Sequence, residues 1–107
     1  MDEEPSPAIR ILFVEDVRED AERAVYHIKR ANVACEWRRV ETESGLISEL
    51  GQFQPHLVLS DFSLPQFDGM SALRITRERA HDVPFLFLSG TIGEERAIQA
   101  LRAGAVD

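Results

Sequence analysis

A regular alternation of short apolar runs with longer amphipathic segments is the feature that most constrains the fold. Short runs rich in branched apolar side chains predict buried strands, and apolar residues three and four positions apart predict helices. The predicted strands span residues 9–14, 35–42, 56–60 and 84–89, and the predicted helices span residues 20–31, 44–53, 70–79 and 94–104.

Strands that alternate with helices predict one α/β sheet. Each strand is joined to the next by a right-handed crossover, so the strands run parallel and helices cover both faces of a doubly wound sheet. Ligands of such sheets bind beyond the carboxyl ends of the strands, where the strand order reverses. The residues that directly follow the strands are therefore the first candidates for a functional site.

The length of 107 residues is sufficient for one domain and one hydrophobic core. Residues 1–7, MDEEPSP, are acidic and contain two prolines, and we expect them to form a flexible N-terminal tail. The remaining residues, 8–107, are expected to form a single domain.

Composition excludes several classes of function. The formal net charge of -7 argues against direct nucleic-acid binding, since phosphate backbones attract basic surfaces. No apolar run approaches the roughly 18 residues of a membrane span. Cys35 is the only cysteine, and the N-terminus lacks the basic and apolar regions of a secretory signal, so we expect a cytoplasmic protein without internal disulfides.

Acidic side chains follow two of the predicted strands. Glu15 and Asp16 come directly after the first strand, and Asp61 follows the third. Because the carboxyl ends of parallel strands meet at one edge, these three carboxylates should converge, and their mutual repulsion would be costly without a hard cation. Carboxylate oxygens are the ligands that Mg²⁺ prefers, so the pattern predicts a Mg²⁺ site.

The same edge contains a possible nucleophile. A carboxylate can attack phosphorus to form an aspartyl-phosphate, and a nearby cation offsets the charge that develops. This chemistry points to Asp61, which would explain a charged group at the end of an apolar strand. Ser89 follows the neighbouring strand and could donate a hydrogen bond to the phosphoryl group.

Three segments, ILFVEDVRED, LVLSDFSLPQFDGM and PFLFLSGTIGEERAIQALRAGAVD, together resemble the receiver domain of bacterial two-component response regulators, in the family's order and spacing from about residue 9 to residue 107. The resemblance implies a flavodoxin-like sheet of strand order 2-1-3-4. It implies that Asp61 accepts a phosphoryl group from a histidine kinase or a phosphotransfer protein, and that Ser89 is the switch hydroxyl. It also implies that Mg²⁺ is bound by Glu15, Asp16, Asp61 and the backbone carbonyl of Ser63.

The sequence departs from the family pattern at its C-terminus. Receivers use a lysine at the end of a fifth strand, whereas the only lysine here is Lys29, in the first predicted helix. We therefore expect a receiver that is incomplete, with strand five and helix five missing after Asp107. Without a fifth strand, the edge of strand 84–89 would be open to pairing, which favours a homodimer through this edge and helix 94–104.

Three alternatives compete with the signalling interpretation. The unmatched lysine is compatible with a receiver that acts in docking or dimerisation without phosphorylation. A Mg²⁺-dependent phosphohydrolase also uses an aspartate at a strand end, but it needs a second aspartate at the position where this chain has Ser63. A dinucleotide-binding domain needs a glycine-rich turn where Glu15 and Asp16 follow the first strand. We therefore predict a signalling module rather than an enzyme.

Overall fold

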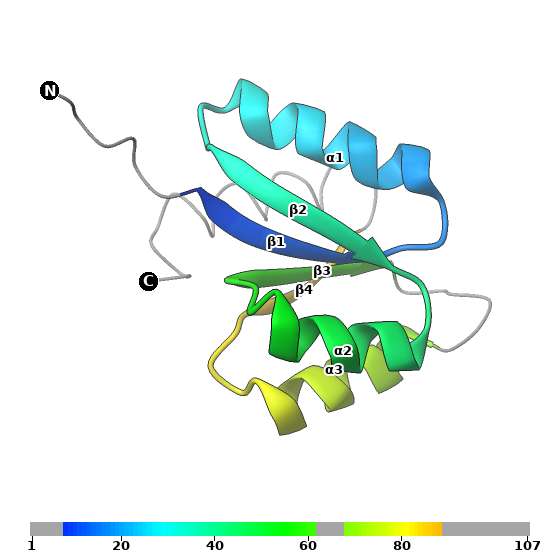
Figure 1. The fold of residues 1–107 in the computed structure, drawn as a ribbon. Helices are drawn as coiled ribbons and strands as arrows, with labels where there is room; N and C mark the ends of the chain where they lie inside the picture. The colour runs from blue at the N-terminus through cyan, green and yellow to red at the C-terminus, as the bar shows by residue number, and fades with distance from the viewer. Residues whose placement is uncertain (1–7, 62–67, 89–107) are drawn as a thin grey trace, which may run out of the picture.

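The computed structural model describes residues 8–61 and 68–88. In these ranges a four-stranded parallel sheet has the order β2-β1-β3-β4, as predicted. The strands are β1 (Ile9–Val14), β2 (Cys35–Val40), β3 (Leu57–Asp61) and β4 (Phe85–Leu88), and the helices are α1 (Arg18–Arg30), α2 (Glu43–Gln52) and α3 (Gly69–Arg79). Helix α1 covers one face of the sheet, and α2 and α3 cover the other (Figure 1). The predicted helix 94–104 lies outside the described residues.

Strand β1 lies at the centre of the sheet and is buried on both faces. Ile11, Leu12, Phe13 and Val14 have no exposed surface. Side chains alternate along a strand, so Ile11 and Phe13 pack with α1, while Leu12 and Val14 pack with α2 and α3. This explains why the first apolar run is nearly continuous, as is typical of strands in doubly covered parallel sheets.

Helix α1 buries the stripe of residues that its spacing predicted. Ala21, Ala24, Val25 and Ile28 are buried against the sheet. The helix begins at Arg18, two residues before the predicted start. The prediction missed these residues because they are polar and add nothing to the apolar pattern. Val17, which precedes it, makes no side-chain capping hydrogen bond.

The boundary between β2 and α2 is set by Thr42. Its Oγ1 accepts a hydrogen bond from the Gly45 N–H at 3.0 Å, which satisfies one of the free N–H groups at the start of α2. Strand β2 therefore ends at Val40 and not at residue 42 as predicted. The partial alternation of this segment predicts a strand up to residue 42, but the capping bond places Thr42 at the start of α2.

The Thr42→Ala variant is expected to be less stable than the wild type by about 1 kcal/mol, because Gly45 loses its hydrogen-bond acceptor. Urea unfolding followed by circular dichroism measures this difference. Thr42→Ser is the matched control, since it keeps the hydroxyl group and should recover most of the loss. Equal stability of the alanine variant and the wild type would contradict the assigned cap.

The amino-terminal end of the sheet is fixed by a reciprocal pair between β1 and the start of β3. The Arg10 N–H donates to His56 Nδ1 at 2.9 Å, and the His56 N–H donates to the Arg10 carbonyl at 2.8 Å. Burial and the nearby Arg10 charge lower the pKa of His56, which favours the neutral imidazole that can accept this bond. The interaction sets the register of the two strands that end in the acidic residues.

Helix length and hydropathy also bear on membrane association. Across residues 8–61 and 68–88, no helix is long and apolar enough to cross a membrane. The longest described helix, α1, has 13 residues and presents a charged outer surface.

Candidate functional site

Strands β1 and β3 bring three carboxylates together at the carboxyl edge of the sheet. The strands are adjacent and parallel, with Val14 paired to Ser60, so the residues that follow them are neighbours. One carboxylate oxygen from each of Glu15, Asp16 and Asp61 lies within 4.8 Å of the other two. The predicted convergence is therefore present, and Asp61 is the last residue of β3 itself.

Glu15 is the most deeply buried member of this acidic cluster, with 5% of its surface exposed. Its N–H donates to the Val40 carbonyl at 2.9 Å, and its Oε2 accepts from the Val17 N–H at 3.1 Å. Burial raises the pKa of Glu15 to about 7, and the charges of Asp61, Asp20 and Asp16 add to this rise, while the Val17 N–H opposes it. The ionised form of Glu15 is thus disfavoured in the metal-free protein.

Asp16 and Asp61 are half-buried, so their carboxylates remain within reach of a ligand from solvent. The main-chain carbonyl of Asp61 accepts a hydrogen bond from Ser60 Oγ at 2.8 Å, which helps to fix the end of β3. Ser63 and Ser89 lie outside the described residues, and their roles as metal ligand and switch hydroxyl stay predictions.

The chemistry of this donor set fits a hard divalent cation. Mg²⁺ takes carboxylate oxygens as ligands, and the structure brings one oxygen from each of three carboxylates to within 4.8 Å of the others. A bound cation would also favour the ionised form of Glu15, which burial and neighbouring acids oppose.

Arg39 on β2 contacts the backbone of the acidic cluster, and the sequence analysis did not identify it. Its Nη1 donates to the backbone carbonyl of Glu15 at 3.1 Å. In the sheet, Arg39 is paired with Phe13, so its side chain reaches two residues further along the chain. Cys35, Trp37 and Arg39 alternate along β2 and so lie on one face of the strand, toward α1. The only signal in the sequence was a charged residue on a strand face that otherwise packs toward α1. This signal did not predict the contact with the Glu15 carbonyl.

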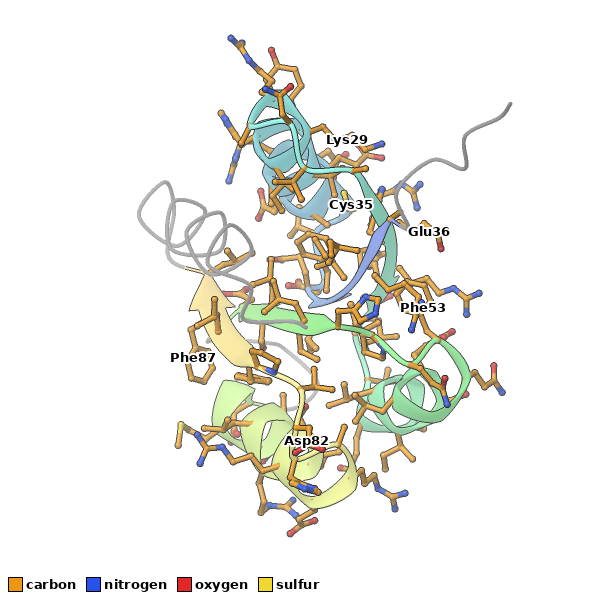
Figure 2. The ribbon with its side chains drawn as sticks, turned by 90° about the vertical axis from the view of Figure 1, so that its left-hand side faces the viewer. Lys29, Cys35, Glu36, Phe53, Asp82 and Phe87 are labelled. Carbon is orange, nitrogen blue, oxygen red and sulfur yellow. The ribbon has the colours of Figure 1, made fainter. Side chains whose placement is uncertain are left out.

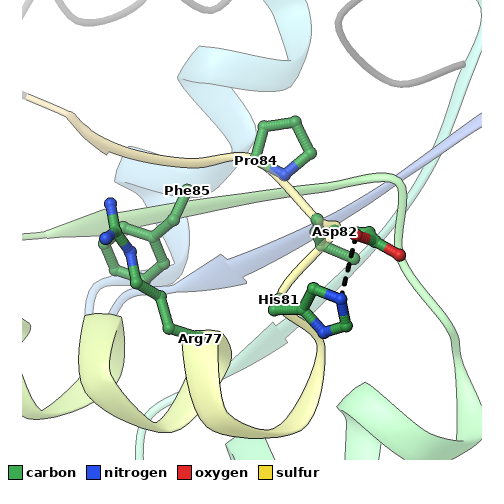
Figure 3. Close-up of a pocket in the computed structure, with 6 residues that line it drawn as sticks. Arg77, His81, Asp82, Pro84 and Phe85 are labelled. Carbon is green, nitrogen blue, oxygen red and sulfur yellow. Dashed lines mark ion pairs between the residues drawn. The ribbon is translucent and has the colours of Figure 1, made fainter.

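A surface pocket at the opposite end of the sheet lies away from this cluster. It is formed by the end of α3 and the start of β4, as Figure 3 shows, and is lined by Arg77, His81, Asp82, Val83, Pro84 and Phe85. His81 and Asp82 form an ion pair of 3.2 Å, but their side chains are 81% and 90% exposed. Exposed pairs of this kind contribute little, and we assign this pocket no role.

The stability of the metal-free protein should depend on pH through Glu15. Its pKa is about 7 in the folded state and 4.5 as a free side chain. The folded state therefore holds the proton more tightly, so this contribution is fully present below about pH 4.5 and is lost as the pH rises through about 7. The separation of the two values corresponds to on the order of 3 kcal/mol.

Urea unfolding in EDTA, from about pH 4.5 to about pH 8, tests this dependence. Glu15→Gln cannot ionise but can still accept from the Val17 N–H, so its stability relative to the wild type should increase with pH. Addition of Mg²⁺ at high pH should stabilise the wild type more than the variant. Parallel pH profiles for the two proteins would show that Glu15 does not titrate as described.

A parallel sheet in the order β2-β1-β3-β4, with an acidic cluster at its carboxyl edge, defines a flavodoxin-like α/β domain. The family model of the response regulator receiver domain matches residues 11–107. The chain therefore belongs to the receiver domain family of response regulators.

Known proteins support this assignment. Regulatory protein LuxO of Vibrio cholerae is 35% identical over 68 residues, which is 64% of this chain and 15% of LuxO. A protein-glutamate methylesterase/protein-glutamine glutaminase of Oceanobacillus iheyensis is 44% identical over 68 residues, 61% of this chain and 18% of that protein. The crystal structure of a response regulator from Hahella chejuensis has the same fold, with a TM-score of 0.67 and 22% identity over 90% of this chain and 74% of that one.

The chain matches only a small part of each curated relative. The chain spans less than a fifth of the length of either curated relative. One of these relatives is a regulatory protein and the other an esterase, so the shared part does not determine the output of the whole protein.

Proposed function

We propose that this receiver accepts a phosphoryl group on Asp61 from a phosphohistidine of a sensor histidine kinase or a phosphotransfer protein. A carboxylate oxygen of Asp61 forms the new bond to phosphorus. The bond between phosphorus and the imidazole nitrogen breaks, and its electron pair stays on that nitrogen, which takes up a proton. The observation that supports this proposal is the position of Asp61 beside Glu15 and Asp16 at the carboxyl edge.

In this proposal, Glu15, Asp16, Asp61 and the backbone carbonyl of Ser63 hold Mg²⁺. The cation, when bound, offsets negative charge on the phosphoryl oxygens during transfer. The Ser89 hydroxyl then donates a hydrogen bond to the phosphoryl group, and the added charge shifts the surface that follows β4 between two states. The domain would act as a signalling module, and not as an enzyme that turns over a substrate.

We further propose a cytoplasmic protein that binds neither nucleic acid nor a membrane directly, which the net charge of -7 and the single cysteine favour. A homodimer through the β4 edge and helix 94–104 is also proposed. Among the described strands β4 pairs only with β3, and its sequence FLFL is strongly apolar. An apolar strand at the edge of the described sheet favours pairing with another chain.

Intact-mass measurement after incubation with Mg²⁺ and acetyl phosphate tests the proposed function. We expect a gain of one phosphoryl group, and no gain when EDTA replaces Mg²⁺. No gain with Mg²⁺ from either acetyl phosphate or a phosphorylated kinase would contradict phosphoryl transfer and favour a docking receiver. A gain that is insensitive to EDTA would contradict the metal requirement alone.

A further inference from the structure

The turn between β1 and α1 bears two of the three clustered carboxylates, yet its own sequence provides few contacts to hold it. Val17, which precedes α1, makes no side-chain cap. The Val17 N–H instead donates to Glu15 Oε2 at 3.1 Å, so one of the candidate cation ligands also holds the turn. The Glu15 carboxylate would have to hold the turn and bind a cation at once, so the turn needs support from a neighbouring element.

Strand β2 supplies that support through the backbone of Glu15. The Glu15 N–H donates to the Val40 carbonyl at 2.9 Å, and the Glu15 carbonyl accepts from Arg39 Nη1 at 3.1 Å. The backbone N–H and the backbone carbonyl of Glu15 are therefore both hydrogen-bonded to β2. The first bond continues the pairing of the two strands, whereas the second depends entirely on the arginine side chain.

The Arg39 side chain is largely enclosed, with 22% of its surface exposed. Its described ionic partner is Glu41, whose Oε2 lies 3.8 Å from Nη1 and whose side chain is 44% exposed. Arg39 Nε is buried and has no hydrogen-bond partner among the described residues. An unpaired buried N–H is unfavourable. The position of the Arg39 side chain is therefore not the one that would give its guanidinium the most hydrogen bonds.

We propose that Arg39 is a positioning residue of the cation site, which holds the Glu15 carbonyl and with it the turn that presents Glu15 and Asp16 to Asp61. Groups that orient metal ligands without binding the ion commonly affect metal affinity strongly. The inference rests on the proposed function, because it assumes that the cluster binds Mg²⁺.

Two effects of removing Arg39 have opposite signs, which makes the proposal testable. The guanidinium is a positive charge near a cation site, so its removal should tighten cation binding if charge alone mattered. If positioning dominates, its removal should weaken binding because the turn is no longer held against β2. The direction of the change therefore distinguishes the two effects.

Arg38 is the matched control, since it is the adjacent arginine on the same strand. Its side chain lies on the other face of β2, where Nη1 pairs with Glu49 Oε1 at 2.7 Å and makes no described contact with the turn. Arg38→Ala and Arg39→Ala remove the same charge from the full chain. A difference between them reflects the contact with Glu15.

Mg²⁺ affinity is measured by calorimetric titration of the wild type, Arg39→Ala and Arg38→Ala, after circular dichroism shows that each is folded. We expect about tenfold weaker binding for Arg39→Ala and less than about twofold change for Arg38→Ala. Arg39→Lys, which can still donate to the carbonyl, should recover part of the loss. If Arg39→Ala does not fold, Arg39→Lys is compared with Arg38→Lys, and only the former should bind more weakly.

A metal-free measurement complements the titration. In EDTA, amide hydrogen exchange of Glu15 and Val17 should be faster in Arg39→Ala than in the wild type, with no change in Arg38→Ala. Unchanged exchange, or Mg²⁺ binding by Arg39→Ala that equals or exceeds that of the wild type, would overturn the inference and leave the proposed function intact. Absence of Mg²⁺ binding by the wild type would overturn both the inference and the metal requirement of the proposed function.

Discussion

Asp61→Asn is expected to take up no phosphoryl group from acetyl phosphate under conditions in which the wild type gains one. An amide has nearly the shape of a carboxylate but lacks the anionic oxygen that attacks phosphorus, so uptake should fall at least 100-fold, to about the background level. The substitution also removes one negative charge from the acidic cluster and should weaken Mg²⁺ binding. Intact mass measures uptake, and calorimetry measures the cation affinity.

The matched control is Asp82→Asn. Asp82 lies in the turn between α3 and β4, as Figure 2 shows, and its side chain is 90% exposed. This turn precedes β4 and therefore lies at the opposite end of the parallel sheet from the acidic cluster. This variant loses the same charge and should gain a phosphoryl group as the wild type does. Release of the group by hydroxylamine would identify an acyl phosphate. Phosphoryl uptake that persists in Asp61→Asn would place the acceptor elsewhere and contradict the proposed function.

Phe13→Ala is expected to have the largest effect on stability, a loss of about 3–5 kcal/mol in the free energy of unfolding. Phe13 has no exposed surface and packs edge-to-face on Trp37, with ring centroids 5.8 Å apart. Its removal leaves a cavity at the centre of the sheet that neighbouring strands cannot fill without distortion. Because small domains are stable by only about 5–15 kcal/mol, much of the chain could unfold.

Urea unfolding followed by far-ultraviolet circular dichroism measures the loss. Tyr26→Ala is the control for removal of a ring, because Tyr26 lies on the outer surface of α1 and is 56% exposed. It should change stability by less than about 0.5 kcal/mol. A loss below about 1 kcal/mol in Phe13→Ala would mean that the core around β1 is less closely packed than described.

The order and direction of the elements could be predicted because each strand and helix has a clear periodicity. The errors lie at the boundaries, where local contacts compete with propensity. Thr42 reads as a strand residue but caps α2, and the polar residues at the start of α1 form helix without an apolar pattern. The first of these boundaries depends on a side-chain hydrogen bond, and the second on a polar turn, and a periodicity of apolar residues contains neither.

The candidate site was predictable to the extent that it follows from topology. Glu15, Asp16 and Asp61 converge because parallel strands end at the same edge. The sequence did not indicate which of the three carboxylates would be the most buried, because Glu15 and Asp61 both lie at the ends of apolar strands; the structure shows that Glu15 is buried, with 5% exposure. The contact of Arg39 with a backbone carbonyl was not predictable, because it depends on strand register and leaves no residue pattern.

The central position of β1 has a consequence for how long the site persists. Opening of α1, or of α2 and α3, exposes one face of the sheet, whereas β1 is released only when both layers have been lost. We expect the amides of β1 to exchange most slowly among the described residues. The acidic turn is thus attached to the strand that we expect to open least often among the described elements. Transient opening of a single helix layer would leave the turn attached to the sheet.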